Sequence, residues 1–145
     1  MAGEKSATYS NQLLALLFNA TAIPNIAINA TSSPLTNLYA SLHTADPGAG
    51  GNQTTNEVSY TGYARIAVAR TTGGFVVTGT SASPVANISF PNPTGTPTQI
   101  ATFLGIGAAS SGAGTFFYAI PISPTITITA GLPPTVTIAT TWTEA

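Results

Sequence analysis

The fold of this protein is indicated by one stretch of alternating residues that runs into a turn, Leu38-Tyr39-Ala40-Ser41-Leu42-His43-Thr44-Ala45-Asp46-Pro47-Gly48. Successive side chains of an extended strand point to opposite faces. The apolar residues at positions 38, 40 and 42 therefore share one face, and Tyr39, Ser41 and His43 share the other. Residues 46–52 are Asp, Pro, Gly, Ala and Asn, most of which favour turn dihedral angles. The stretch predicts a β-strand followed by a tight turn.

The same pattern recurs along the rest of the chain, with turns roughly every 8–12 residues. Arg65 is expected to point outward, and Ile100, Thr102, Leu104 and Ile106 are expected to share one face. A series of this kind predicts an antiparallel β-sandwich of about seven to eight short strands. The expected strands are 38–43, 63–70, 75–78, 85–90, 100–106, 115–120, 125–129 and 135–138.

A short helix is predicted before the strands. Leu13, Leu14, Leu17 and Phe18 follow one another at helical spacing, and Ser10 is the expected N-cap. The helix must end before proline 24, and residues 19–36 then form a connector that lies either on a neighbouring subunit or on its own domain. We therefore predict an N-terminal helix and extended arm over residues 1–36 and a β-sandwich domain over residues 37–145. The apolar run 13–18 is too short to span a bilayer, which needs about 20 residues.

Charged side chains are scarce. The 145 residues include three basic and four acidic ones, with one histidine and no cysteine. Nucleic-acid binding needs several Lys or Arg contacts to phosphate, so this class of partner is excluded. Cysteine-based zinc sites, iron–sulfur clusters and disulfides are excluded by count. A neutral, hydroxyl-rich exterior gives little protection against self-association, which favours a component of an assembly.

No pattern of residues predicts a catalytic, cofactor or metal site. His43 and Asp46 are three residues apart, but no nucleophile motif accompanies them, so Asp46 is expected to cap its turn. Asp46, Asn52 and Glu57 make at most a weak calcium site, because the loop lacks the ligand spacing of an EF-hand. The glycines at 105, 107, 112 and 114 precede no Lys-Ser/Thr pair and indicate a hairpin turn rather than a phosphate loop.

The few charges predict one ion pair. Glu57 is expected to pair with Arg65 or Arg70, within one subunit or across a subunit boundary. The aromatic residues leave a second possibility open, a sugar-stacking platform, although aromatic side chains in a sandwich more often belong to the core or an interface. The residues concerned are Tyr9, Tyr39, Tyr60, Tyr63, Tyr118 and Trp142.

Two segments resemble a known family. The stretch 38–48, continued by Asn56-Glu57-Val58-Ser59-Tyr60-Thr61-Gly62-Tyr63-Ala64-Arg65, is similar to small virion proteins of tailed bacteriophages, of the head-decoration (cement) or tail-fibre-like kind. Phe103-Leu104-Gly105-Ile106-Gly107-Ala108-Ala109-Ser110-Ser111-Gly112 and the N-terminal helix resemble the same family. The likeness covers nearly the whole chain and implies a structural, non-enzymatic role on a phage particle.

The expected function is that of a capsid decoration protein that bridges neighbouring subunits of the major capsid protein. The alternative is a tail or tail-fibre-associated subunit that binds a glycan or receptor. We expect a homotrimer on the virion, made in the bacterial host cytoplasm, with no cofactor and no nucleic-acid, membrane or small-molecule partner. The expected interaction residues are Leu13, Leu14, Leu17, Phe18, Glu57, Arg65, Arg70 and Trp142.

Overall fold

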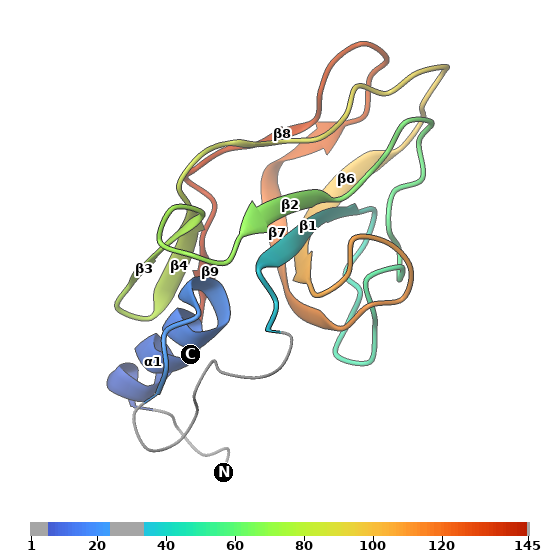
Figure 1. The fold of residues 1–145 in the computed structure, drawn as a ribbon. Coiled ribbons are helices and arrows are strands. Elements are labelled where there is room, and N and C mark those ends of the chain that lie inside the picture. The colour runs from blue at the N-terminus through green and yellow to red at the C-terminus, as the bar shows by residue number, and fades with distance from the viewer. Residues whose placement is uncertain (1–5, 24–33, 145) are drawn as a thin grey trace.

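A computed structural model describes residues 6–23 and 34–144, and in this part of the chain one helix precedes nine short strands (Figure 1). The expected mainly β, antiparallel fold is confirmed. The elements are α1 (Ala7–Asn19), β1 (Asn37–His43), β2 (Ile66–Ala69), β3 (Phe75–Thr78), β4 (Ser81–Pro84), β5 (Ile88–Ser89), β6 (Ile100–Gly107), β7 (Phe116–Thr127), β8 (Thr135–Val136) and β9 (Trp142–Thr143). Residues 24–33 of the predicted arm lie outside the described residues, and the predicted boundary at residue 37 stays a prediction.

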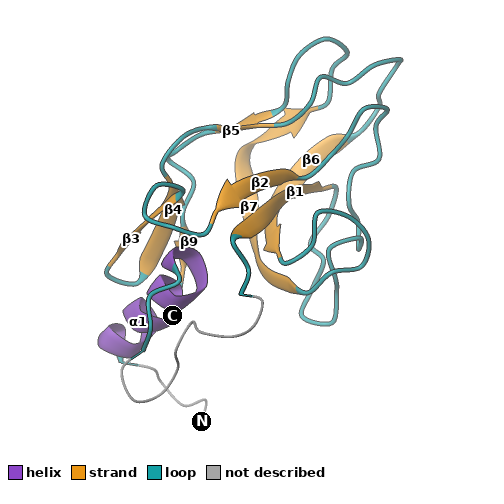
Figure 2. Ribbon diagram, viewed as in Figure 1, coloured by secondary structure: helices purple, strands orange, loops and turns teal. Residues whose placement is uncertain are grey.

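The strands form three small antiparallel sheets, none of them closed (Figure 2). The largest has the order β2-β1-β6-β7, the second β3-β4-β9, and the third is the pair β5-β8. The central strand β1 pairs with β2 through Leu38 opposite Val68 and with β6 through Leu42 opposite Leu104. The strands β1 and β6 therefore sit in the middle of the molecule, and β2 and β7 are the sheet's two edges.

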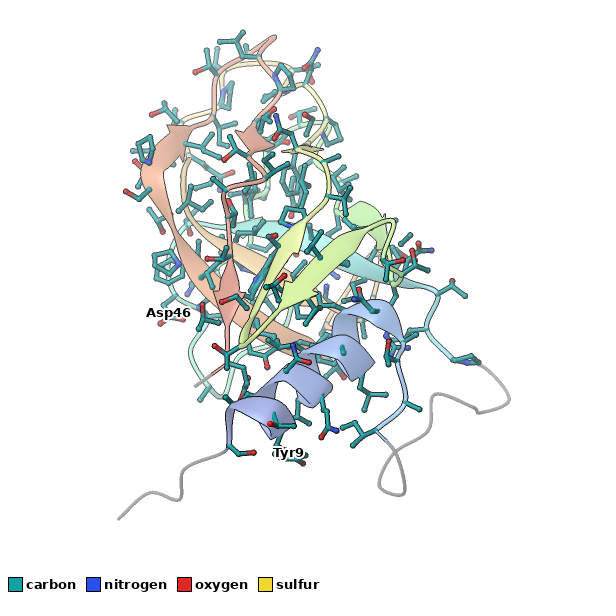
Figure 3. All side chains as sticks on the ribbon, turned by 90° about the vertical axis from the view of Figure 1, so that its left-hand side faces the viewer. Tyr9 and Asp46 are labelled. Atoms are coloured by element: carbon teal, nitrogen blue, oxygen red, sulfur yellow. The ribbon has the colours of Figure 1, made fainter. Side chains whose placement is uncertain are left out.

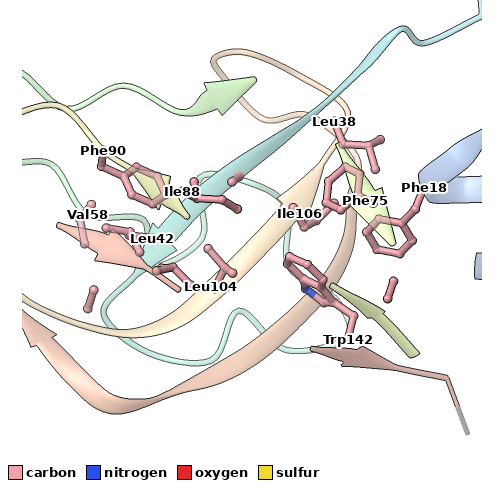
Figure 4. Packing of buried hydrophobic residues seen from close by; sticks show 14 of the residues in the cluster. Phe18, Leu38, Leu42, Val58, Phe75, Ile88, Phe90, Leu104, Ile106 and Trp142 are labelled. Atoms are coloured by element: carbon pink, nitrogen blue, oxygen red, sulfur yellow. The ribbon is translucent and has the colours of Figure 1, made fainter. Parts of the chain in front are cut away.

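One hydrophobic core joins the three sheets and the helix. Phe90 and Ile88, from the β5 region, lie near Leu42 and Leu104 of the central strands (Figure 4). At the other end Trp142 of β9 packs against Phe18 of α1 and Phe75 of β3, with ring centroids 5.5 and 6.0 Å apart. All seven side chains are at most 3% exposed. The helix and the C-terminal strand therefore close one end of the core.

The helix begins one turn earlier than expected. The N-cap is Ser6, whose Oγ accepts a hydrogen bond from the Tyr9 N–H at 3.2 Å. Ser10, the expected cap, lies inside the helix and is 1% exposed. The predicted end before proline 24 is correct, since α1 stops at Asn19.

Two expectations about which side chains of the strands are buried are wrong. A β-bulge between Ala101 and Phe103 reverses the alternation in β6, so Ala101 is buried where Thr102 was expected, and Ile100 is 48% exposed. Arg65 was expected to point outward, but it is 8% exposed because it pairs with Glu57 inside the molecule. The sequence patterns also missed β4 and β9 and divided β7 into two strands.

Truncation of Trp142 should destabilise the fold strongly. Its ring is fully buried, and its indole N–H has no hydrogen-bond partner in the described part of the chain, so packing alone stabilises it there. We expect Trp142→Ala to lower the free energy of unfolding by about 3–5 kcal/mol, measured by urea denaturation. Leu132→Ala, at a side chain 63% exposed, is the control and should change it by less than about 0.5 kcal/mol. Equal losses in the two variants would contradict this packing.

Candidate functional site

Two loops meet at the guanidinium of Arg65. Its Nε and Nη2 each donate to a carboxylate oxygen of Glu57 at 2.7 Å, a bidentate ion pair. Its Nη1 donates to the Ala109 carbonyl at 2.9 Å, and Nη2 also donates to the Gly112 carbonyl at 2.8 Å. The connection between β1 and β2, which contains both Glu57 and Arg65, is thereby joined to the β6–β7 loop. We call Glu57, Arg65 and these two carbonyls the polar clamp.

Burial of the Arg65 and Glu57 side chains favours the pairing of their charges. The side chains of Arg65 and Glu57 are only 3% and 13% exposed. The hydrogen bonds to Glu57 raise the pKa of Arg65, so its guanidinium remains charged. Tyr63 donates its hydroxyl to Glu57 at 2.9 Å and accepts the Leu42 N–H at 3.1 Å, which ties the clamp to β1. The predicted Glu57–Arg65 pair is confirmed, and it lies within one subunit.

Gln53 extends the clamp, and no sequence pattern singled it out. Its fully buried amide accepts the Ala109 N–H at 2.8 Å and donates to the Ala109 carbonyl at 3.2 Å. A Cβ at Gly107 or Gly114 would lie 2.2–2.3 Å from the Gln53 side chain. These two glycines are therefore required by close packing, and the glycine-rich stretch is the predicted hairpin turn rather than a phosphate loop.

Ser41 and His43 form a buried pair beside the clamp. The His43 Nδ1 lies 2.9 Å from the Thr55 carbonyl, which can only accept, so Nδ1 carries the proton. Nε2 then accepts from the Ser41 hydroxyl at 2.8 Å. A nucleophile and base have this arrangement, but both side chains are 0% exposed, so no substrate reaches them. His43 is a structural residue, as expected.

The side chains considered as calcium ligands interact with other groups of the protein. Asp46 Oδ1 accepts the Gly48 N–H at 2.8 Å, which is the predicted turn cap. Asn52 Oδ1 accepts from the backbone and hydroxyl of Thr54. Glu57 belongs to the clamp. Within residues 6–23 and 34–144, no three His, Cys, Asp or Glu side chains are grouped as a metal site would require.

Arg70 donates hydrogen bonds to the end of α1 rather than pairing with Glu57. Its Nε donates to the Leu17 carbonyl at 2.5 Å and its Nη2 to the Leu16 carbonyl, at the C-terminal end of α1. A cation at this end is also favoured by the helix dipole. Its Nη1 reaches the Leu35 carbonyl at 3.2 Å. Arg70 thus joins the helix, β2 and the start of β1.

An apolar cleft of about 400 Å³ lies beside Arg70. We call it the helix cleft, and its wall is formed by Leu13, Leu16, Leu17, Leu35, Arg70, Phe117 and Tyr118. Of the expected interaction residues, Leu13 and Leu17 are half-buried and line this cleft. Leu14, Phe18 and Trp142 belong to the core, and Glu57 and Arg65 to the clamp. Contact of any of them with a partner stays a prediction.

The aromatic residues do not form one exposed platform. Tyr63 stacks on Phe90 and meets Tyr60 edge to face, whereas Tyr118 and Trp142 pack around Phe18. Tyr9 is 37% exposed and projects from the outer side of α1, away from both groups (Figure 3). The sugar-stacking surface suggested by the sequence is therefore absent from the described part of the chain.

Family comparison defines the class of the protein as a virion fibre protein of tailed phages. Residues 4–142 match the model of the Gp80 family, described as podophage GP4 fiber I protein gp80. The chain belongs to this family. A search of curated proteins finds no match. In the described part of the chain, α1 is too short for a membrane-spanning helix.

The clamp should behave as one energetic unit. Arg65→Met leaves the Glu57 carboxylate buried without its cation, and we expect a loss of about 3–5 kcal/mol in the free energy of unfolding. Glu57→Gln combined with Arg65→Met should cost clearly less than the sum of the two single variants, because neither charge is then left unpaired. Urea denaturation of the four proteins gives the coupling energy. Additive losses would show that the pair is not coupled.

His43 should make stability depend on pH. Burial lowers its pKa below the ordinary value of 6.5, and the Thr55 and Glu57 interactions only partly oppose this effect. The unfolded chain therefore binds a proton at a pH where the folded chain does not. Stability is complete above about pH 6.5 and falls below it, by at most about 1.4 kcal/mol per pH unit.

Thermal unfolding between pH 7 and pH 5 measures this slope, with His43→Gln as the control. His43 is the one histidine of the sequence. Ordinary carboxyl groups titrate lower, near pH 4. The variant should therefore lose most of the slope, whatever its stability at pH 7. A wild-type stability that stays constant from pH 7 to pH 5 would contradict the expectation.

Proposed function

We propose that this protein is a structural subunit of the phage fibre apparatus and acts by burying uncharged surface against neighbouring virion proteins. The observation that carries this proposal is the match to the fibre family over residues 4–142. The composition of the surface supports it. Among the described residues, Asp46 is the one charged residue that is exposed (Figure 3). A subunit with this surface meets little like-charge repulsion when it packs against a copy of itself.

The polar clamp supplies rigidity for this role. Two loops are connected through hydrogen bonds that lie inside the subunit, so their outer surfaces keep a constant shape without surface ion pairs. A subunit that must fit its neighbours repeatedly benefits from such fixed loops, because less conformational entropy is lost when the contact forms. Weak single contacts would be strengthened by repetition along the assembly.

The helix cleft is the surface that we assign to a neighbouring virion protein. It is mostly apolar and lies next to Tyr118, whose hydroxyl donates to Glu144 near the C-terminus. The fibre position is favoured over the capsid position by the family match. Self-association as a homotrimer and contact with the major capsid protein remain proposals.

Localisation on intact particles tests the proposal. We expect cryo-electron microscopy to show density that fits β1, β6 and β7 in the fibres. Density at a fixed copy number over the icosahedral shell would instead support the decoration role. A matched pair of variants tests the cleft: Leu13→Glu should reduce incorporation into particles at least about tenfold, because the charge loses its hydration when a neighbouring protein covers the cleft. Leu132→Glu, on an exposed loop, should leave incorporation unchanged, and equal incorporation of both would exclude the cleft.

A further inference from the structure

A second cleft separates two strand edges. It measures about 400 Å³ and lies between β2 and the segment that contains β5. We call it the edge cleft; it is lined by residues 66–69, 73–74 and 86–89, and none of these side chains is charged. Within the described residues, β2 is an outer strand of the four-stranded sheet, and β5 pairs only with β8.

The hydrogen-bond register shows which backbone groups of β2 face outward. The Arg70 N–H donates to the Thr36 carbonyl at 2.9 Å, which continues the ladder between β1 and β2. In an antiparallel pair the residues bonded to the partner strand alternate. Ile66 and Val68 therefore direct their backbone groups toward β1. Ala67, which lies between them, directs its N–H and C=O away from β1, on the side of the edge cleft.

The same reasoning applies to β5. The Phe90 N–H donates to the Pro134 carbonyl at 2.8 Å, and Ile88 lies opposite Val136. Ile88 and Phe90 are thus the residues bonded to β8. The backbone groups of Asn87 and Ser89 face the other way, and both residues line the edge cleft. Backbone donors and acceptors are therefore available on both walls.

The other edge of the large sheet is less suited to pairing. The strand β7 contains Pro121 and Pro124, which have no N–H to donate. The strand β2 contains no proline and no charged residue, the two devices that commonly protect an edge. The β2 edge therefore lacks the features that commonly block the addition of a further strand.

We propose that the edge cleft binds an extended segment of a second copy of this protein by strand addition to β2. Backbone hydrogen bonds supply the affinity in this mode of recognition. A charged segment would lose its hydration against an uncharged wall, whereas no strand in the described part of this chain contains an Asp, Glu, Lys or Arg residue. The proposal concerns self-association and does not depend on where the protein lies in the particle.

Sedimentation velocity over a concentration series tests the proposal with three variants. Ala67→Pro removes the outward N–H but none of the bonds to β1, and Ala67→Glu places a charge in the cleft. Both should raise the dissociation constant for self-association at least about tenfold. Ala64→Glu is the matched control, because Ala64 is exposed on the same segment but outside the cleft, and it should behave as wild type. Far-ultraviolet circular dichroism verifies that each variant is folded.

Hydrogen exchange gives a readout that a general loss of stability would not reproduce. The Ala67 amide should exchange rapidly in dilute protein and become protected as the concentration rises, while the amides of Ile66 and Val68 stay protected throughout. A wild-type protein that remains monomeric would overturn the proposal, since a second copy would not be the occupant. Association that Ala67→Pro leaves unchanged would overturn it equally, because another face would then carry the contact.

Discussion

The bidentate pair between Arg65 and Glu57 is the interaction on which the arrangement of the loops depends. Both groups are withdrawn from water, which is costly for a charge unless a partner of opposite sign compensates. Arg65 reaches further, to the carbonyls of Ala109 and Gly112, so one side chain connects segments more than 40 residues apart in sequence. Loops without any regular structure are thereby held at fixed positions around the end of β1.

Arg70 plays a related part at the opposite end of the sheet. It donates to carbonyls at the end of α1 and so joins a helix to a sheet that would otherwise meet it only through apolar contacts. The protein therefore uses both described arginines inside the structure rather than on its surface. This use leaves the surface of the described residues almost free of charge, which for a monomer is a liability and for a subunit of an assembly is an advantage.

The helix cleft and the edge cleft offer different kinds of contact. The helix cleft is lined by leucine and aromatic side chains and offers area for hydrophobic burial. The edge cleft offers backbone donors and acceptors instead, and its walls carry no charged side chain. The first suits a partner with apolar side chains, and the second suits an extended chain.

The sequence by itself determined the class of fold, the turns and the scarcity of charged side chains. These features are local or follow from counts: an alternation of period two is visible in 38–43 or 75–78 without any knowledge of the rest of the chain. The two possible partners of Glu57 were also visible, because so few charges exist. The resemblance of two segments to phage virion proteins placed the chain in the right group, but the capsid role was ranked above the fibre role that the family supports.

Only the tertiary structure decided which arginine pairs with Glu57, how the core is closed and which edges stay open. The bulge in β6 depends on its pairing with β7, and the burial of Trp142 depends on Phe18 and Phe75, far away in sequence. Gln53 had no recognisable motif, because its role comes from the backbone that surrounds it. Such features are set by contacts between distant residues, and a local pattern cannot contain them.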